Sequence, residues 1–208
     1  MDQRDEVIQT VTPLVAVPSF AHLAHLHEVG QRYLVGRYGL MLEVRRPWFH
    51  GLWPTGTKAK GTYPYGDTKP FMKLLCGPLP MEFLQRFERE AASWSPSEHA
   101  TWITWHEVTG VWTYRELKVS QRGSHCIQYE RPTLEEDEHL VLDLHSHGDG
   151  HAFFSPQDDA DDLGEVKIAG VLGKCRHPRN SWCFRMVALG HQLPFEALRF
   201  EENNLAAA

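Results

Sequence analysis

The most informative stretch of this sequence is a mostly apolar run that ends in two histidines. The run Leu140–Leu144 is short and rich in branched apolar residues, and it leads directly into His145 and His147. Such a run is typical of a strand in the interior of a sheet. Successive side chains of a strand point to opposite faces, so the two imidazoles face the same way. The sequence therefore predicts a central strand whose end directs two imidazoles at one point.

A tight loop and a helix are expected directly after the histidines. Loop 148–154 contains glycines that let the backbone reverse, and Ser155 followed by proline is typical of a helix N-terminus. Asp158 then falls in the first helical turn and can return to His145 and His147. Two imidazole nitrogens and one carboxylate oxygen bind zinc and leave its fourth tetrahedral position for water. We therefore predict a Zn²⁺ site.

A hydrolytic site of this kind also needs a base that takes a proton from water. Glu107 is the candidate, because it lies in the run Thr101–Tyr114, whose aromatic and β-branched residues predict a long strand buried on both faces. An isolated carboxylate there is costly to ionise, whereas a neighbouring zinc site gives it a partner and a task. The structural alternative is an ion pair between Glu107 and Arg115 or Arg122.

Together these residues resemble the signature of the JAMM (JAB/MPN-type) zinc metallopeptidases. The matching residues are Glu107-Val-Thr-Gly, then His145-Ser-His147, and, after seven further residues, Ser155 and Asp158. A pattern with several fixed positions is far more specific than an isolated pair of histidines. By this resemblance, Glu107 is the general acid/base and Ser155 helps to hold the oxyanion of the tetrahedral intermediate. The resemblance makes His145, His147 and Asp158 the zinc ligands.

The resemblance covers residues 78–200 and implies the fold. It implies an α/β (α+β) sandwich of the cytidine-deaminase-like type, with a central mixed sheet flanked by helices. The apolar stripe from Phe83 to Trp94 predicts a helix with one buried face. Further strands are expected at 124–129, paired with 101–114, and at 166–172 and 182–189. Gly148 and Phe154 stand where many family members have proline, which changes the expected path of the ligand loop.

The first part of the chain differs in character, so we predict an accessory subdomain at 1–77 and a metallopeptidase domain at 78–208. Strand-like runs at 33–35 and 40–44 precede a segment, 47–70, that is dense in proline, glycine and aromatic residues. Proline and glycine at this density break helices and long ladders. We expect loops and short strands pinned by aromatic side chains. An aromatic surface that grips a substrate protein is the alternative.

Composition excludes several classes of partner. The formal net charge is −6, and no stripe of lysine and arginine is present, which argues against binding to nucleic acid. No apolar run approaches the length of a membrane span, and the N-terminus lacks the features of a secretory signal. We therefore expect a cytoplasmic protein with reduced cysteines. The HxE and PCxxC motifs of a nucleobase deaminase are absent.

The resemblance also suggests a substrate class. The motif DLHSHG, the later AFFS and DDADD, and the turn-rich N-terminal part are most similar to the JAB-type proteins of the bacterial PRTRC plasmid-associated system. Families of that kind occur beside ThiF/E1-like proteins and ubiquitin-like modifiers. This implies a protein substrate, cleaved at a peptide or isopeptide bond near the C-terminus of a modifier. The functional alternative is a non-catalytic MPN-type scaffold that binds a partner protein.

Less specific interpretations remain for several of these residues. Ser155 and Asp158 also match a capping box, which needs no metal, and a cap of this kind can itself position a ligand. His106 faces away from Glu107, and His151 is expected to be a solvated loop residue. The acidic residues at 159, 161 and 162 are expected to form a solvated run that favours the start of a helix.

Overall fold

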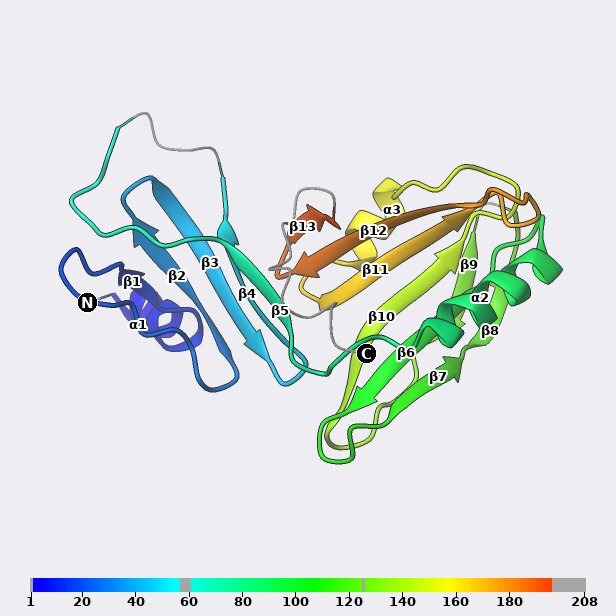
Figure 1. Ribbon diagram of the computed structural model, residues 1–208, viewed down its shortest axis with the longest axis horizontal. Helices are drawn as coiled ribbons and strands as arrows, with labels where there is room; N and C mark the ends of the chain where they lie inside the picture. Colours follow the sequence, from blue (N-terminus) through cyan, green and yellow to red (C-terminus); the bar gives the residue numbers. More distant parts are fainter. Residues whose placement is uncertain (1, 57–60, 125, 196–208) are drawn as a thin grey trace. The chain divides into compact units, whose positions relative to one another are not determined.

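The computed structural model of the chain describes residues 2–56, 61–124 and 126–195 (Figure 1). It separates into two compact units, of which the first ends at Gly77 and the second begins at Pro78. The last part of the predicted second domain, 196–208, lies outside the described residues. None of the helices in the described parts of the chain is long and apolar enough to span a bilayer.

The first unit is built on a five-stranded sheet. In sheet order its strands are β1 (Leu14–Ala16), β2 (Gly30–Gly36), β3 (Gly39–Arg46), β4 (Phe49–Pro54) and β5 (Phe71–Leu74). β1 is parallel to β2, and the other neighbours are antiparallel. Helix α1 (Gln3–Val11) precedes the sheet and buries none of its residues. Val17, Leu34, Met41 and Leu52 form an apolar cluster in this unit.

A buried carboxylate organises the polar interior of the first unit. The side chain of Glu43 on β3 has no exposed surface, and its Oε1 lies 2.9 Å from His25 Nδ1 and 3.0 Å from His50 Nε2. Its Oε2 accepts a hydrogen bond from Arg32 Nε at 2.7 Å. Burial alone raises the pKa of Glu43, but the bonds from His50, the Leu26 backbone and Arg32 outweigh it and lower the pKa to about 2.

The second unit is built on a six-stranded mixed sheet of order β13-β12-β11-β10-β6-β7. β10 is parallel to β11, and all other neighbours are antiparallel. The strands are β6 (Ala100–His106), β7 (Trp112–Glu116), β10 (Glu138–Ser146), β11 (Val166–Gly173), β12 (Ser181–Ala188) and β13 (His191–Pro194). A separate hairpin pairs β8 (Lys118–Arg122) with β9 (Ile127–Glu130).

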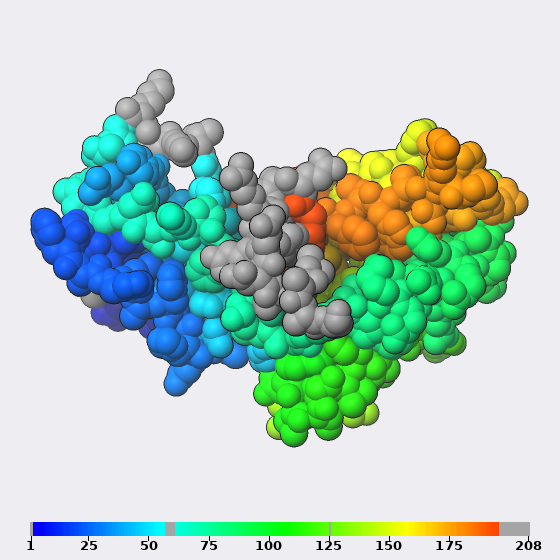
Figure 2. All heavy atoms as spheres, in the orientation of Figure 1, coloured from blue at the N-terminus to red at the C-terminus, as the bar shows by residue number. Residues whose placement is uncertain are grey.

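The two helices of this unit lie on opposite faces of the sheet. Helix α2 (Met81–Trp94) buries Phe87, whose ring contacts Trp182 on β12, and the helix covers part of this face in the space-filling view (Figure 2). Helix α3 (Pro156–Asp161) contacts the other face through Arg185, which is an odd number of residues from Trp182 on the same strand. A mixed sheet flanked by helices is the α/β (α+β) fold that was expected.

Two expectations about the strands are wrong. Residues 101–114 do not form one long strand: β6 ends at His106, and a turn closed by Gly110, with φ +68°, leads back into β7. His106 N donates to Val111 O at 3.0 Å across this turn. Glycine adopts a positive φ without strain, so the sequence EVTG makes a hairpin. The strand expected at 124–129 is β9, and it pairs with β8 instead of β6.

Candidate metal centre

Three side chains from two elements converge at one end of the second unit's sheet. His145 lies near the end of β10, His147 follows the strand, and Asp158 lies in the first turn of α3. The Nε2 atoms of the two histidines are 3.2 Å apart, and His145 Nε2 is 3.4 Å from Asp158 Oδ1. Ligand atoms of all three side chains lie within 4.8 Å of one another. The structure thus brings together the three residues selected from the sequence.

These distances fit a zinc ion. Two ligand atoms bound to tetrahedral zinc at about 2.0–2.1 Å lie about 3.3 Å apart, which is close to both separations at His145. His147 Nδ1 lies 3.1 Å from His151 O, so that nitrogen can donate to the carbonyl and leave Nε2 as the ligand. Burial lowers the pKa of His145, which favours the neutral imidazole that a metal requires.

Close backbone packing fixes the ligand loop after β10. His147 N donates to Leu172 O, and Lys174 N donates to Gly150 O, so the loop continues the contact between β10 and β11. Gly148 has a φ of +52°, and a Cβ at this position would lie 2.3 Å from Pro96 O. Glycine is therefore required at position 148.

The capping box and the ligand interpretation of α3 both hold geometrically. Asp158 N donates to Ser155 Oγ at 3.2 Å, and Ser155 N donates to Asp158 Oδ2 at 2.6 Å. This reciprocal pair fixes the carboxylate of Asp158 and leaves Oδ1 towards His145. The cap therefore positions the candidate ligand, and Ser155 lines the same cavity as the three metal-binding candidates.

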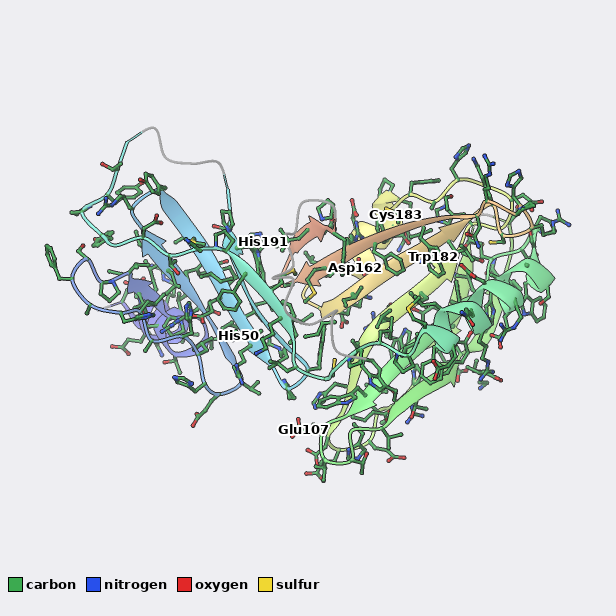
Figure 3. The ribbon with its side chains drawn as sticks, viewed as in Figure 1. His50, Glu107, Asp162, Trp182, Cys183 and His191 are labelled. Atoms are coloured by element: carbon green, nitrogen blue, oxygen red, sulfur yellow. The ribbon has the colours of Figure 1, made fainter. Side chains whose placement is uncertain are left out.

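Glu107 does not reach this cluster, and its predicted position is wrong. β6 runs antiparallel to β10, so His106 pairs with Glu138 at one end while Ala100 pairs with His145 at the other. Glu107 therefore lies at the far end of the sheet, at the β6–β7 turn (Figure 3). Its Oε2 is 2.8 Å from His139 Nε2, and its side chain is partly exposed. The structural alternative, an ion pair of Glu107 with Arg115 or Arg122, is also wrong: Arg115 pairs with Glu138, and Arg122 donates to the carbonyl of Glu98.

A different carboxylate, Glu98, occupies the histidine end of β6. It precedes the strand and lines the same cavity as the cluster, with only 6% of its surface exposed. Burial, followed by the charge of Asp158, raises the pKa of Glu98 to about 7. Its backbone is held on both sides, because Glu98 N donates to Gly123 O at 2.8 Å and Arg122 Nη1 donates to Glu98 O at 2.6 Å.

A signal for Glu98 exists in the sequence, but it depends on the pairing direction. If β6 is antiparallel to the histidine strand, residues before β6 lie beside the histidines and residues after it do not. His99 confirms the arrangement, since its N–H donates to Ser146 Oγ and its carbonyl accepts from Ser146 N. The choice of Glu107 followed from a local motif that is in fact a turn.

The cavity around the cluster has a volume of about 1390 Å³ and extends along the sheet face. Its lining includes residues of β9 and of α3, together with the exposed ring of Phe153. The Phe153 ring contacts the His147 ring edge to face, with 4.6 Å between centroids. His151 is exposed, as expected, and contributes its carbonyl to His147.

Comparison with known families adds independent information on both units. Residues 2–75 match a family described only as a domain of unknown function, DUF2016. Residues 80–186, just over half of the chain, match the family described as prokaryotic homologs of the JAB domain. No curated protein and no solved structure matches the chain. The family match coincides with the α2–β12 region that carries the cluster, and the chain therefore belongs to the prokaryotic JAB-domain family.

Proposed function

We propose that this protein is a zinc-dependent peptidase that hydrolyses a peptide or isopeptide bond, with His145, His147 and Asp158 as ligands. Glu98, and not Glu107, is the proposed general acid/base. The proposal is supported chiefly by one observation: three donors with zinc-like spacing share a cavity with a buried carboxylate. Membership of the JAB-domain family agrees with this chemistry.

When bound, a zinc ion polarises the scissile carbonyl and lowers the pKa of a water molecule at the site. Glu98 accepts a proton from that water as its oxygen bonds to the carbonyl carbon. Glu98 then gives the proton to the amine nitrogen as the carbon–nitrogen bond breaks. The Ser155 hydroxyl accepts a hydrogen bond from Asp158 N and keeps its own hydrogen to donate to the substrate's developing oxyanion.

The hairpin strand β9 favours an extended peptide as substrate. The consecutive residues Ile127, Gln128 and Tyr129 all line the cavity, so the strand presents its edge there. One edge of β9 pairs with β8, and among the described residues no backbone hydrogen bond joins the other edge to a strand. An extended segment can add to such an edge through main-chain hydrogen bonds.

The C-terminal tail of a ubiquitin-like modifier is a substrate of this extended kind, and we propose it as the protein partner. A ThiF/E1-like protein is a further proposed partner. Both proposals, and a specific relation to the PRTRC system, rest on the sequence resemblance.

The two glutamates provide a matched test of the mechanism. Zinc-loaded protein is incubated with a quenched fluorescent peptide library, and cleavage is measured for the wild type, Glu98→Gln and Glu107→Gln. We expect Glu98→Gln to lower kcat by about 10²–10⁴-fold, because a positioned base contributes about that factor. Glu107→Gln is expected to retain wild-type activity. Full activity of Glu98→Gln, or loss of activity only in Glu107→Gln, rejects the assignment of the base.

A chelator control separates this proposal from the scaffold alternative. Peptide cleavage by the wild type is expected to stop on addition of a chelator and to return with Zn²⁺, because the ligands must hold the metal for hydrolysis. A protein that binds zinc at the cluster yet cleaves neither the library nor a modifier with an extended C-terminus is a scaffold.

A further inference from the structure

Helix α3 is held on the sheet by charged side chains. None of its six residues is buried, so apolar packing contributes little to its position. Asp159 Oδ1 accepts from Arg185 Nη1 at 2.6 Å, and Asp162 Oδ2 accepts from Arg185 Nη2 at the same distance. Asp162, which ends the helix, has a side chain only 6% exposed. The expectation that Asp162 belongs to a solvated run was therefore wrong.

A buried lysine links this helix to the strand of the first histidine. Lys167 on β11 has a side chain only 2% exposed, and its Nζ lies 2.7 Å from Asp143 Oδ2 and 2.9 Å from Asp162 Oδ1. Burial lowers the pKa of Lys167, but the two carboxylates outweigh it and leave the pKa above its ordinary value. The ammonium group is therefore charged, and it contacts one carboxylate from β10 and one from the end of α3.

The bridge connects the two elements that carry the candidate ligands. Asp143 lies two residues before His145 on β10, so both side chains are on the same face of the strand. Asp162 lies four residues after Asp158, one helical turn along α3. The bridge from Asp143 through Lys167 to Asp162 therefore sets the separation between β10 and α3. It does so close to the contact between His145 and Asp158.

We propose that Lys167 is a positioning residue for the metal centre, which holds α3 against β10 so that Asp158 Oδ1 faces His145 Nε2. This inference rests on the proposed metal site and assigns a role to residues that take no part in the hydrolytic chemistry. Breaking the bridge leaves all three ligands present but lets the carboxylate move relative to the imidazoles. The affinity for metal should therefore fall even where the protein remains folded.

Metal affinity of the folded protein tests this role without using activity. Zn²⁺ dissociation constants are measured by competition with a chelating dye, and the absorption spectrum of the Co²⁺-substituted protein reports the ligand geometry. Lys167→Met removes the charged ammonium group and keeps most of the length of the side chain. We expect its Zn²⁺ dissociation constant to rise about 10–100-fold, the usual effect of losing a group that orients a metal ligand. The Co²⁺ spectrum should change as well.

A second variant covers a failure of Lys167→Met to fold. Asp143→Asn removes the negative charge from the strand end of the bridge while Lys167 keeps its contact with Asp162. We expect this variant to fold and to bind Zn²⁺ more weakly than the wild type. Arg115→Met is the matched control, because it breaks the pair with the buried Glu138 at the opposite end of the same sheet. It should lower thermal stability and leave the metal affinity unchanged.

The outcomes separate this inference from the proposed function. Wild-type Zn²⁺ affinity in folded Lys167→Met, or in Asp143→Asn if the first variant does not fold, overturns the positioning role and leaves the metal site intact. An equal loss of affinity in Arg115→Met overturns it too, since the effect then follows stability alone. A wild-type protein that binds no metal overturns the proposed function together with the inference.

Discussion

The carboxyl groups of Glu98 and Glu107 lie at opposite ends of β6 in different surroundings. Glu107 is partly exposed, and its Oε2 lies 2.8 Å from His139 Nε2. Glu98 is buried, and its side chain has no hydrogen bond or ion pair to other described residues. A carboxyl group whose pKa is raised to about 7 can both take and give a proton near neutral pH. The two glutamates therefore differ in their surroundings, although they are the same residue type.

Ser155 offers a residue-scale prediction, because one hydroxyl is expected to perform two tasks. Ser155→Ala removes the acceptor of the helix cap, which should lower the free energy of unfolding by about 1 kcal/mol. It also removes the proposed donor to the oxyanion, so kcat should fall. Ser155→Thr keeps the hydroxyl and should restore both quantities. Denaturant titration measures the first effect, and steady-state kinetics on a cleaved library peptide measures the second. Wild-type kcat in Ser155→Ala removes Ser155 from the mechanism.

At the scale of elements, the candidate metal centre lies beside a close contact between two loops. The ligand loop passes the segment before β6 at Gly148, whose Cα faces the Pro96 carbonyl. Ser95 Oγ donates to Asp149 Oδ1 at 2.6 Å in the same region. The contact holds the backbone of Glu98 near the histidines, so loop packing and the position of the proposed base are linked.

Gly148→Ala tests this contact against a second glycine. The substitution meets both the strain of φ +52° and the Pro96 oxygen 2.3 Å from the new Cβ, whereas Gly110→Ala meets a φ of +68° with no atom within 4 Å. Backbone strain of this kind costs about 1–3 kcal/mol, so both variants should lose stability. Only Gly148→Ala should also weaken Zn²⁺ binding, measured by dye competition. Equal Zn²⁺ affinities of the two variants contradict the proposed link.

At the scale of the whole molecule, local patterns in the sequence predicted elements better than their pairing. The helix at α2, the strand before His145 and the cap at Ser155 follow from short-range spacing and turn residues. The direction of β6 relative to β10 decides which end of β6 lies beside the histidines, and short-range spacing does not encode that direction. The prediction for Glu107 is wrong for this reason. Burial of Asp162 likewise depends on Lys167 and Arg185, which come from later strands.

The first unit should have its own response to acid. The pKa of Glu43 is lowered from 4.5 to about 2, so the stabilisation is complete above about pH 4.5 and is lost as the pH falls towards 2. The shift corresponds to about 3 kcal/mol of folding free energy. The protection factors of β3 and β4 amides against hydrogen exchange should therefore fall over this range in the wild type. In Glu43→Gln these protection factors should already be lower at neutral pH and depend less on pH. An unchanged pH profile in this variant contradicts the assignment.

The central claim is that His145, His147 and Asp158 hold one metal ion, and metal analysis of the purified protein tests it most directly. The protein is loaded with Zn²⁺, passed through a desalting column and analysed for bound metal by mass spectrometry. We predict one zinc ion per chain in the wild type, Glu98→Gln and Glu107→Gln, and loss of zinc in His145→Ala and Asp158→Ala. A wild-type protein without zinc, or a His145→Ala variant that keeps it, would contradict the account.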